Sequence, residues 1–330
     1  MGIPTLGLCL LIAACVPADG GEDAAPPAPE KGHVDIDGVT LEYRDYGGTG
    51  DLLLFVPSLF MTADVYDRVA PHFTDRYRVL AVTHRWHGTS EQTGLDFTLD
   101  TLALDLAGFI EHFTDEPAIV VGWSQAGMLL PRLARLRPAD VRALIFANAV
   151  WEPMEVPPGL TMPGQISPDS VYPSLEAAAD DLQPLLAVDR PKALKLLSSV
   201  FRQREDGAYI MGPPFDSPEV FTRFAALADA WTGDDYDGIG VPVLAIRVQQ
   251  SKARAAELAR RGLPQDSIDM GVRFVTEYDD VRNTRGLARL LAAVPDAEVV
   301  VLDDVSHNFV IESPEVVSRV VDDFLHRIER

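Results

Sequence analysis

Short runs of hydrophobic residues alternate with longer segments of helical period over most of the chain after residue 32. This alternation is typical of strands that crossover helices join into a largely parallel sheet. The predicted strands are Asp51–Pro57, Tyr77–His84, Pro117–Trp123, Val141–Val150, Val241–Arg247 and Ala297–Val305. The predicted helices are Thr62–Thr74, Thr98–Phe113, Gln125–Arg135 and Ser313–Ile328. The pattern therefore predicts the α/β fold class, with helices on both faces of a mostly parallel sheet.

The pattern differs at the start and in the middle of this folded part. Residues 34–46, broken by Asp37-Gly38, predict a leading hairpin because Asp-Gly is a favoured hairpin turn. Between residues 151 and 240 the alternation stops, and Pro-rich sequence with helical Ala/Leu segments takes its place. We interpret residues 151–240 as an inserted helical cap, and residues 33–150 and 241–330 as the core.

The first residues follow a third pattern. Ile3–Ala14 is an uncharged apolar run that is too short to span a bilayer but is typical of a signal peptide. Small residues directly before Cys15 resemble the lipobox of bacterial lipoproteins, in which the cysteine is lipidated and becomes the new N-terminus. We therefore expect a signal peptide at 1–14, followed at 15–32 by the lipidated cysteine and a disordered, Pro-rich tether. A plain secretory signal and a short buried helix are the alternatives.

The charge and the cysteine content limit the kinds of molecule that the protein is expected to bind. The 330 residues contain 28 Lys and Arg against 50 Asp and Glu, a formal charge of −22, which disfavours binding to nucleic acid or to an anionic membrane face. We expect membrane contact only through the lipid anchor, with the folded domain exported to the outside of the cytoplasm. Both cysteines, Cys9 and Cys15, precede the folded part, which leaves it without a disulfide or a thiolate metal site. We predict no metal and no organic cofactor.

The strand Pro117–Trp123 runs directly into the sequence GWSQAG at 122–127 and then into a predicted helix. A serine on such a strand-to-helix turn has an exposed hydroxyl, and the next backbone N–H groups lie at a helix N-terminus. The motif resembles the G-x-S-x-G nucleophile elbow of α/β-hydrolases, with Ala126 in the second glycine position. The resemblance extends from about residue 34 to the C-terminus, and RWHGTS at 85–90 resembles the R-G-x-G-x-S turn of that family.

The resemblance implies a catalytic triad of Ser124, a histidine base and an orienting carboxylate. His307 follows the last predicted strand and precedes the terminal helix, where the family places its histidine. The acid is open, because no carboxylate directly follows the strand Val241–Arg247. Asp279 has the usual spacing from His307, although it would lie on the flank of a helix over 268–294. Glu152, one strand after the nucleophile, is the alternative, and either carboxylate could instead be a solvated surface charge.

The oxyanion hole needs two backbone donors. By resemblance these are the N–H groups of Gln125, next to the nucleophile, and of Leu59, in the loop after the strand Asp51–Pro57. In this loop Pro57-Ser58 replaces the usual His-Gly of the family. The donors belong to the backbone, so the replacement does not remove them.

These residues predict a serine hydrolase that cleaves an ester or a related small-molecule acyl substrate through an acyl-enzyme on Ser124. The alternatives are a peptidase or a carbon–carbon bond hydrolase of the same fold, or a ligand-binding protein that has kept the fold without turnover. Trp123, Trp151 and Trp231 are expected either to line an apolar pocket or to form the core of the cap.

Overall fold

The structure is a computed structural model of the chain. It describes residues 28–58, 61–161, 170–186, 189–212, 217–249, 255–256, 258–259, 262–303 and 305–329. The predicted signal peptide, Cys15, most of the predicted tether and Leu59 lie outside these residues. The last part of the predicted tether, residues 30–32, belongs to the first strand. The folded part therefore starts earlier than the sequence pattern predicts.

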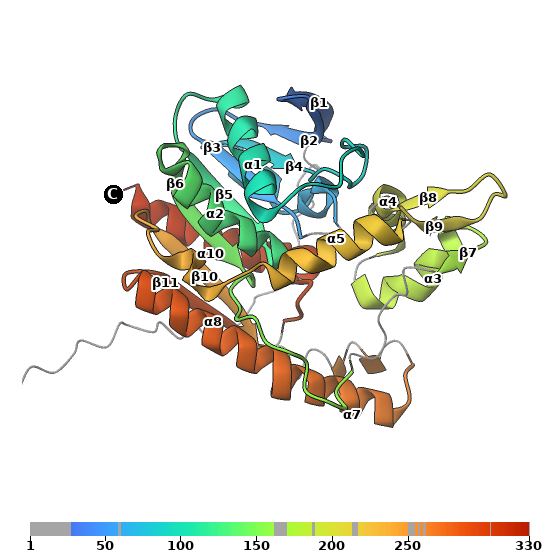
Figure 1. Cartoon of the computed structure of the whole chain (residues 1–330). Coiled ribbons are helices and arrows are strands. Elements are labelled where there is room, and N and C mark those ends of the chain that lie inside the picture. Colours follow the sequence, from blue (N-terminus) through green and yellow to red (C-terminus); the bar gives the residue numbers. More distant parts are fainter. Residues whose placement is uncertain are drawn as a thin grey trace, which may run out of the picture.

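An eight-stranded sheet forms the centre of the molecule, in the order β1-β2-β4-β3-β5-β6-β10-β11 (Figure 1). Its strands are β1 (Glu30–Ile36), β2 (Val39–Gly47), β3 (Leu52–Val56), β4 (Arg78–Val82), β5 (Ala118–Trp123), β6 (Val141–Ala147), β10 (Val243–Gln249) and β11 (Glu298–Asp303). The six strands from β4 to β11 in this order are parallel neighbours, whereas β1 and β2 are antiparallel. The predicted α/β fold with a mostly parallel sheet is confirmed.

The leading hairpin forms as the sequence predicts. Asp37 and Gly38 have φ angles of +52° and +84°, and Ile36 pairs with Val39 across the turn. Positive φ at both turn residues matches the right-handed twist of the flanking strands.

Helices cover both faces of the sheet because the parallel strands are hydrophobic on both sides. In β5, Ala118 and Val120 join one hydrophobic cluster, and Ile119 and Val121 join the other. The first cluster includes side chains of α1 (Leu99–Phe113), α2 (Leu129–Leu136), α5 (Pro218–Asp229) and α8 (Asp280–Ala293). The second includes side chains of η1 (Ala63–Tyr66), η2 (Ala70–Phe73), α3 (Leu175–Leu186), α4 (Arg190–Val200), α9 (Phe309–Glu312) and α10 (Pro314–Ile328).

Two predicted helices differ from the structure. Residues 62–74 do not form one helix but two 3₁₀ segments, η1 and η2, because Pro71 has no N–H to donate in a helix interior. The helix predicted over Gln125–Arg135 begins as the 3₁₀ turn η3 (Ser124–Met128) and becomes α-helical only at Leu129.

Between β6 and β10 the chain leaves the sheet and forms the region predicted as a helical cap, on the right of Figure 1. It contains α3, α4, α5 and η5 (Gly233–Tyr236), together with a small sheet of β7 (Val171–Tyr172), β9 (Tyr209–Met211) and β8 (Phe201–Gln203). Trp151 and Trp231 are 7% and 2% exposed, and the Trp231 Nε1–H group donates a hydrogen bond to the Trp151 carbonyl. Both rings belong to the hydrophobic cluster that includes α5 and α8.

A second insertion separates β10 from β11. Here α7 (Gln265–Phe274), the π-helical turn η6 (Val275–Asp279) and α8 follow one another, close to the helix expected over 268–294. A Cβ atom on Gly286 of α8 would lie 2.4 Å from the Trp151 backbone, so glycine allows α8 to contact the start of the cap region directly.

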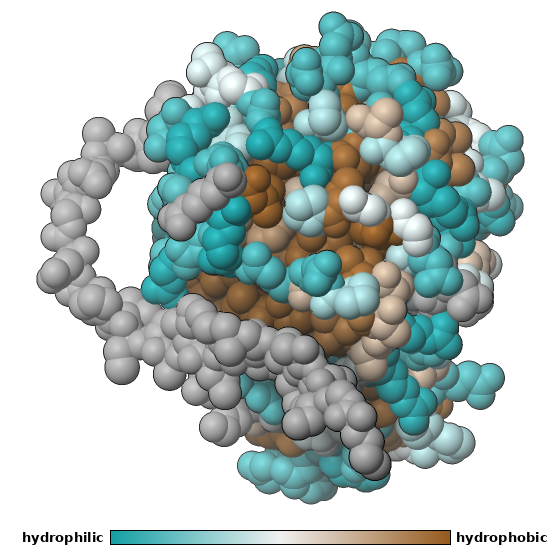
Figure 2. All heavy atoms as spheres, turned by 90° about the vertical axis from the view of Figure 1, so that its left-hand side faces the viewer, coloured by the Kyte–Doolittle hydropathy of each residue, from teal (hydrophilic) through white to brown (hydrophobic). Residues whose placement is uncertain are grey.

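Figure 2 shows the side of the molecule that faces away from the cap region. Hydrophobic residues gather in the middle of this face, with polar residues above them and to either side. Large hydrophobic residues that are exposed, among those described, are Leu95, Leu104, Val156, Val171 and Val301. They belong to five separate segments, as is common for scattered surface side chains.

Candidate active site

The turn after β5 has the backbone conformation of a nucleophile elbow. Ser124 directly follows Trp123, the last residue of β5, and has a φ of +54°. A non-glycine residue in this left-handed region is strained, and such strain gathers at functional sites. The strained turn at the junction between β5 and η3 holds the half-buried serine at the carboxyl end of the sheet.

The glycines of the motif allow close contacts around this turn. A Cβ atom on Gly122 would lie 2.6 Å from Leu130 Cδ1, and a Cβ atom on Gly127 would lie 2.0 Å from the carbonyl oxygen of Ala149. The contact at Gly127 is with backbone, which leaves no room for a larger residue, whereas a larger residue at Gly122 would require the end of the Leu130 side chain to shift. The turn therefore packs directly against the chain that follows β6.

The structure brings Ser124 and His307 together, although 183 positions separate them. Ser124 Oγ lies 2.8 Å from His307 Nε2. The Trp123 indole N–H group donates a 3.1 Å hydrogen bond to the His307 carbonyl, which fixes the histidine loop beside the nucleophile. Trp123 is 1% exposed, so it acts as a buried support rather than an open pocket wall. Sequence analysis missed this contact, for which only the position next to Ser124 gives a signal.

An amide occupies the other side of the histidine ring. Asn148 is the first residue after β6 and has a φ of +47°. Its Nδ2 atom lies 2.7 Å from His307 Nδ1, and its Oδ1 atom accepts a 3.2 Å hydrogen bond from the backbone N–H of Val248. Sequence analysis missed this residue because the predicted strand Val141–Val150 extended past it, whereas β6 ends at Ala147.

The predicted acids lie elsewhere. Asp279 ends η6 and forms a 3.0 Å ion pair with Arg282 of α8. Glu152 forms a 2.8 Å ion pair with Arg289 of the same helix. The prediction of Asp279, with Glu152 as its alternative, is therefore not met at Nδ1 of His307, where the structure places Asn148. Asp279 pairs with an arginine three residues further along the same helical stretch, whereas Glu152 reaches its arginine because α8 contacts the start of the cap region at Trp151.

A buried histidine supports the predicted oxyanion loop. His84 follows β4, and its Nε2 atom lies 3.0 Å from the carbonyl oxygen of Pro57, at the start of the loop after β3. A carbonyl only accepts hydrogen bonds, so Nε2 carries the proton. Gln125, the predicted second donor, is half-buried in the first turn after the nucleophile. Leu59 lies outside the described residues.

Burial keeps this histidine and its neighbour neutral. It lowers the pKa of His84 to about 4, and burial together with the nearby His84 ring lowers the pKa of His87 to about 3. The His87 ring contacts Phe224 of α5 edge to face, with the ring centroids 5.0 Å apart. His87 is therefore a neutral packing group against α5, and His84 is a neutral group that contacts the His87 ring and donates to the Pro57 carbonyl.

The turn at 85–90 that resembles a family motif has a clear structural role. The Arg85 guanidinium donates hydrogen bonds of 2.7 and 2.6 Å to the Asp105 carboxylate of α1, and both side chains are mostly buried. Trp86 and Gly88 have φ angles of +65° and +52°. A bidentate pair of this kind fixes the turn to α1.

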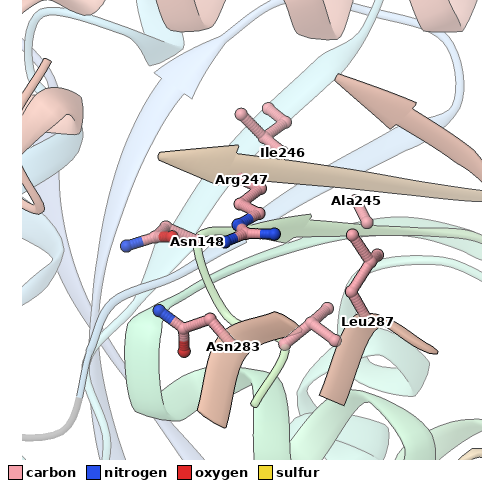
Figure 3. A pocket seen from close by; sticks show the side chains of 7 residues that line it. Asn148, Ala245, Ile246, Arg247, Asn283 and Leu287 are labelled. Carbon is pink, nitrogen blue, oxygen red and sulfur yellow. The ribbon is translucent and has the colours of Figure 1, made fainter. Parts of the chain in front are cut away.

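A small cavity lies beside Asn148, between β10 and α8 (Figure 3). Its volume is about 10 Å³, which is space for about one water molecule. The lining residues are Asn148, Val150, Ala245, Ile246, Arg247, Asn283 and Leu287. Polar groups of Arg247 and Asn283 therefore face the same small space as Asn148. Within the described residues, no group of three or more His, Cys, Asp or Glu side chains is arranged to hold a metal ion.

Comparison with known proteins assigns the family. The sequence model of the α/β-hydrolase family matches residues 53–320, and the chain belongs to this family. A non-heme chloroperoxidase of Streptomyces lividans is 29% identical over 220 residues, which cover 63% of this chain and 77% of the relative. A 2-(acetamidomethylene)succinate hydrolase of Mesorhizobium japonicum is 30% identical over 112 residues, or 34% of this chain and 40% of that protein.

Solved structures agree on the fold. The crystal structure of E-2-(acetamidomethylene)succinate hydrolase matches with a TM-score of 0.66 and 21% sequence identity, and covers 90% of this chain and 99% of its own. At this identity the likeness shows the fold alone. Hydrolase activity is supported by the family and by the names of the relatives.

Proposed function

We propose that the protein is a serine hydrolase that cleaves an ester or a related acyl substrate through an acyl-enzyme on Ser124. The observation that carries the proposal is the 2.8 Å contact between Ser124 Oγ and His307 Nε2 on a left-handed elbow. A serine hydroxyl becomes a useful nucleophile only when a base accepts its proton, and this contact is the geometry that the transfer needs.

The proposed reaction has two halves. Ser124 Oγ attacks the carbonyl carbon while His307 Nε2 takes the hydroxyl proton, and the backbone N–H groups of Gln125 and Leu59 stabilise the oxyanion. The intermediate then expels the alcohol, which receives the proton from His307, and leaves the acyl group on Ser124. A water molecule repeats the sequence and releases the acid. The alternative substrates of the same catalytic residues are peptides, cleaved at an amide bond, and ketones, cleaved at a carbon–carbon bond.

One observation favours a second candidate, a ligand-binding protein without turnover. A neutral amide, that of Asn148, lies 2.7 Å from His307 Nδ1. An amide adds no negative charge to stabilise the imidazolium that forms during catalysis. A binding protein would tolerate this neighbour, whereas a fast hydrolase benefits from a carboxylate.

The two candidates differ in their response to active-site reagents. We expect the purified full-length protein to hydrolyse p-nitrophenyl esters from a series between acetate and palmitate, and to be labelled by a fluorophosphonate probe. Ser124→Ala serves as the matched control and loses both properties. A folded wild-type protein that neither reacts with the probe nor hydrolyses any ester would favour the binding protein.

We further propose that the hydrolase domain is exported and anchored by lipid on Cys15, with membrane contact through this anchor alone. The apolar run Ile3–Ala14 and the small residues before Cys15 support the proposal. In the part of the chain that the structure describes, no helix is long and apolar enough to cross a membrane. Metabolic labelling with a clickable fatty acid tests the anchor in a bacterial host. Cys15→Ser should abolish labelling and Cys9→Ser should retain it, while label on the Cys15→Ser protein contradicts the proposal.

A further inference from the structure

The amide of Asn148 has one favoured orientation. The backbone N–H of Val248 faces one end of the amide, and only an oxygen accepts from it. This places Oδ1 toward Val248 and Nδ2 toward His307, in agreement with the 2.7 Å distance between Nδ2 and Nδ1. Reversing the amide would set an NH₂ group against the N–H of Val248, which has no lone pair to offer.

This orientation determines the position of the histidine proton. Nδ2 can only donate, so His307 Nδ1 must accept and carries no proton in the neutral ring. The proton then lies on Nε2, which faces Ser124 Oγ at 2.8 Å. In this state the ring donates to the serine, whereas a general base must accept from it.

On the basis of the proposed hydrolase, we propose that Asn148 is a positioning residue that holds resting His307 in the tautomer with its proton on Nε2. The productive tautomer, with the proton on Nδ1, forms only when the amide turns over and gives up its bond from Val248. The wild-type enzyme therefore has a low kcat, which is limited by the orientation of the Asn148 amide.

A carboxylate at this position removes the restriction. The side chain of Asn148→Asp has the shape of the amide and two acceptor oxygens, one for the N–H of Val248 and one for His307 Nδ1–H. The same group stabilises the imidazolium formed when Ser124 loses its proton. In serine proteases the reverse change, from Asp to Asn, lowers kcat about 10⁴-fold because the wrong tautomer is held.

Kinetics of the full chain on its best p-nitrophenyl ester provide the first test. Asn148→Asp should raise kcat by about tenfold or more and change KM much less, since the residue acts through the His307 ring. Asn148→Ala, which removes the amide beside Nδ1, should stay within about tenfold of wild type. Asn283→Asp puts a carboxylate on the wall of the same cavity but leaves the Asn148 amide beside Nδ1, so it should leave kcat near the wild-type value. A folded Asn148→Asp protein with unchanged or lower kcat contradicts the proposal, and so does a loss well beyond tenfold in Asn148→Ala.

Imidazole nitrogen NMR provides a test that needs no turnover. At a pH where histidine is neutral, about 8.5, His307 of the wild type should carry its proton on Nε2, and His307→Gln identifies the signal. The Asn148→Asp variant should move the proton to Nδ1. A wild-type ring protonated on Nδ1 would overturn the proposal without affecting the proposed serine chemistry. Ester hydrolysis that survives in Ser124→Ala would instead overturn the serine hydrolase and leave the tautomer result standing.

Discussion

The neighbouring parallel strands β5 and β6 end in the same way but carry different chemistry. In each, the first residue after the strand is a non-glycine residue with positive φ, +54° at Ser124 and +47° at Asn148. The first places a hydroxyl on Nε2 of His307, and the second places an amide on Nδ1 of the same ring. One backbone device, used at two adjacent strand ends, thus aims two side chains at the two nitrogens of one histidine.

The two strand ends differ in the free-energy cost of the left-handed backbone conformation. Asparagine visits the left-handed region more readily than most residues, because its short polar side chain forms local hydrogen bonds there. Serine has less of this advantage, so the turn at Ser124 stores more strain than the turn at Asn148. The more strained conformation lies at Ser124, the proposed nucleophile, in keeping with the tendency of backbone strain to gather at functional sites.

Of the substitutions at the two strand ends, removal of the Ser124 hydroxyl should have the largest effect on ester hydrolysis. Ser124→Ala should lower kcat/KM for the best ester by at least about 10³-fold and leave the unfolding midpoint close to wild type. Asn148→Ala should cause a much smaller change, because it removes no reacting atom. Comparable losses in the two variants would show that the strand ends contribute equally to catalysis.

His84, which follows β4, is a polar group near a third strand end, and its role is structural. His84 has a folded pKa of about 4 against about 6.5 when unfolded, so the unfolded state binds protons more readily. The stability from its burial is complete above pH 6.5 and is lost as the pH falls toward 4, by about 3 kcal/mol at most. Urea unfolding at pH 7 and pH 4.5 measures this loss.

His84→Gln provides the control for that measurement. Glutamine keeps an N–H donor for the Pro57 carbonyl but does not titrate, so the variant should lose less stability between the two pH values. His87 contributes to the loss that remains, since its pKa is also lowered by burial. Equal losses in wild type and His84→Gln would mean that His84 is not buried neutral.

Gly127 links the two strand ends, because its Cα faces the Ala149 carbonyl one residue after Asn148. Gly127→Ala places a methyl group 2.0 Å from that oxygen, and should cost about 2 kcal/mol of unfolding free energy and reduce ester hydrolysis. Gly240→Ala is the matched control, since a Cβ atom there has nothing within 4 Å. If both alanine variants unfold at the same urea concentration, the contact between the two strand ends is not a tight one.

The smallest expected effect concerns the strain itself. Ser124→Gly should raise the free energy of unfolding by about 1 kcal/mol, because glycine adopts a φ of +54° without steric cost. Asn148→Gly relieves less strain and loses two hydrogen bonds, so its stability should not rise. Thermal unfolding of the two variants measures the difference in strain between the two turns. A larger gain in stability from Asn148→Gly than from Ser124→Gly would contradict the greater strain at Ser124.

Local patterns in the sequence predicted much of the fold, because the sheet follows from hydrophobic runs. The resemblance to α/β-hydrolases singled out Ser124 and His307, which the structure brings together. Asn148 could not be found in this way. Its role depends on β6 ending at Ala147 and on a contact with a residue 159 positions away. The interrupted helix at 62–74 was predictable in principle, because Pro71 lies inside it.

The structure does not bring the two predicted acids to the His307 ring, for a related reason. Spacing placed Asp279 at the usual distance from His307 along the chain, but the long insertion between β10 and β11 uses that stretch to build α7, η6 and α8. A carboxylate on this helical segment is free to pair with arginines along the same surface, as Asp279 does with Arg282. Spacing along a sequence is a weak guide where an insertion changes the path of the chain.

The order of the strands also determines when the site comes into existence. β6 pairs with β10 only after the whole cap region has been made, and β11 can join only after that. Closing so long a loop costs chain entropy that no contact repays until the strands meet, which makes this a late and slow event in folding. A growing chain therefore holds Ser124 before His307 can reach it. On the proposed function, the protein gains its hydrolase activity only when its last strand is in place.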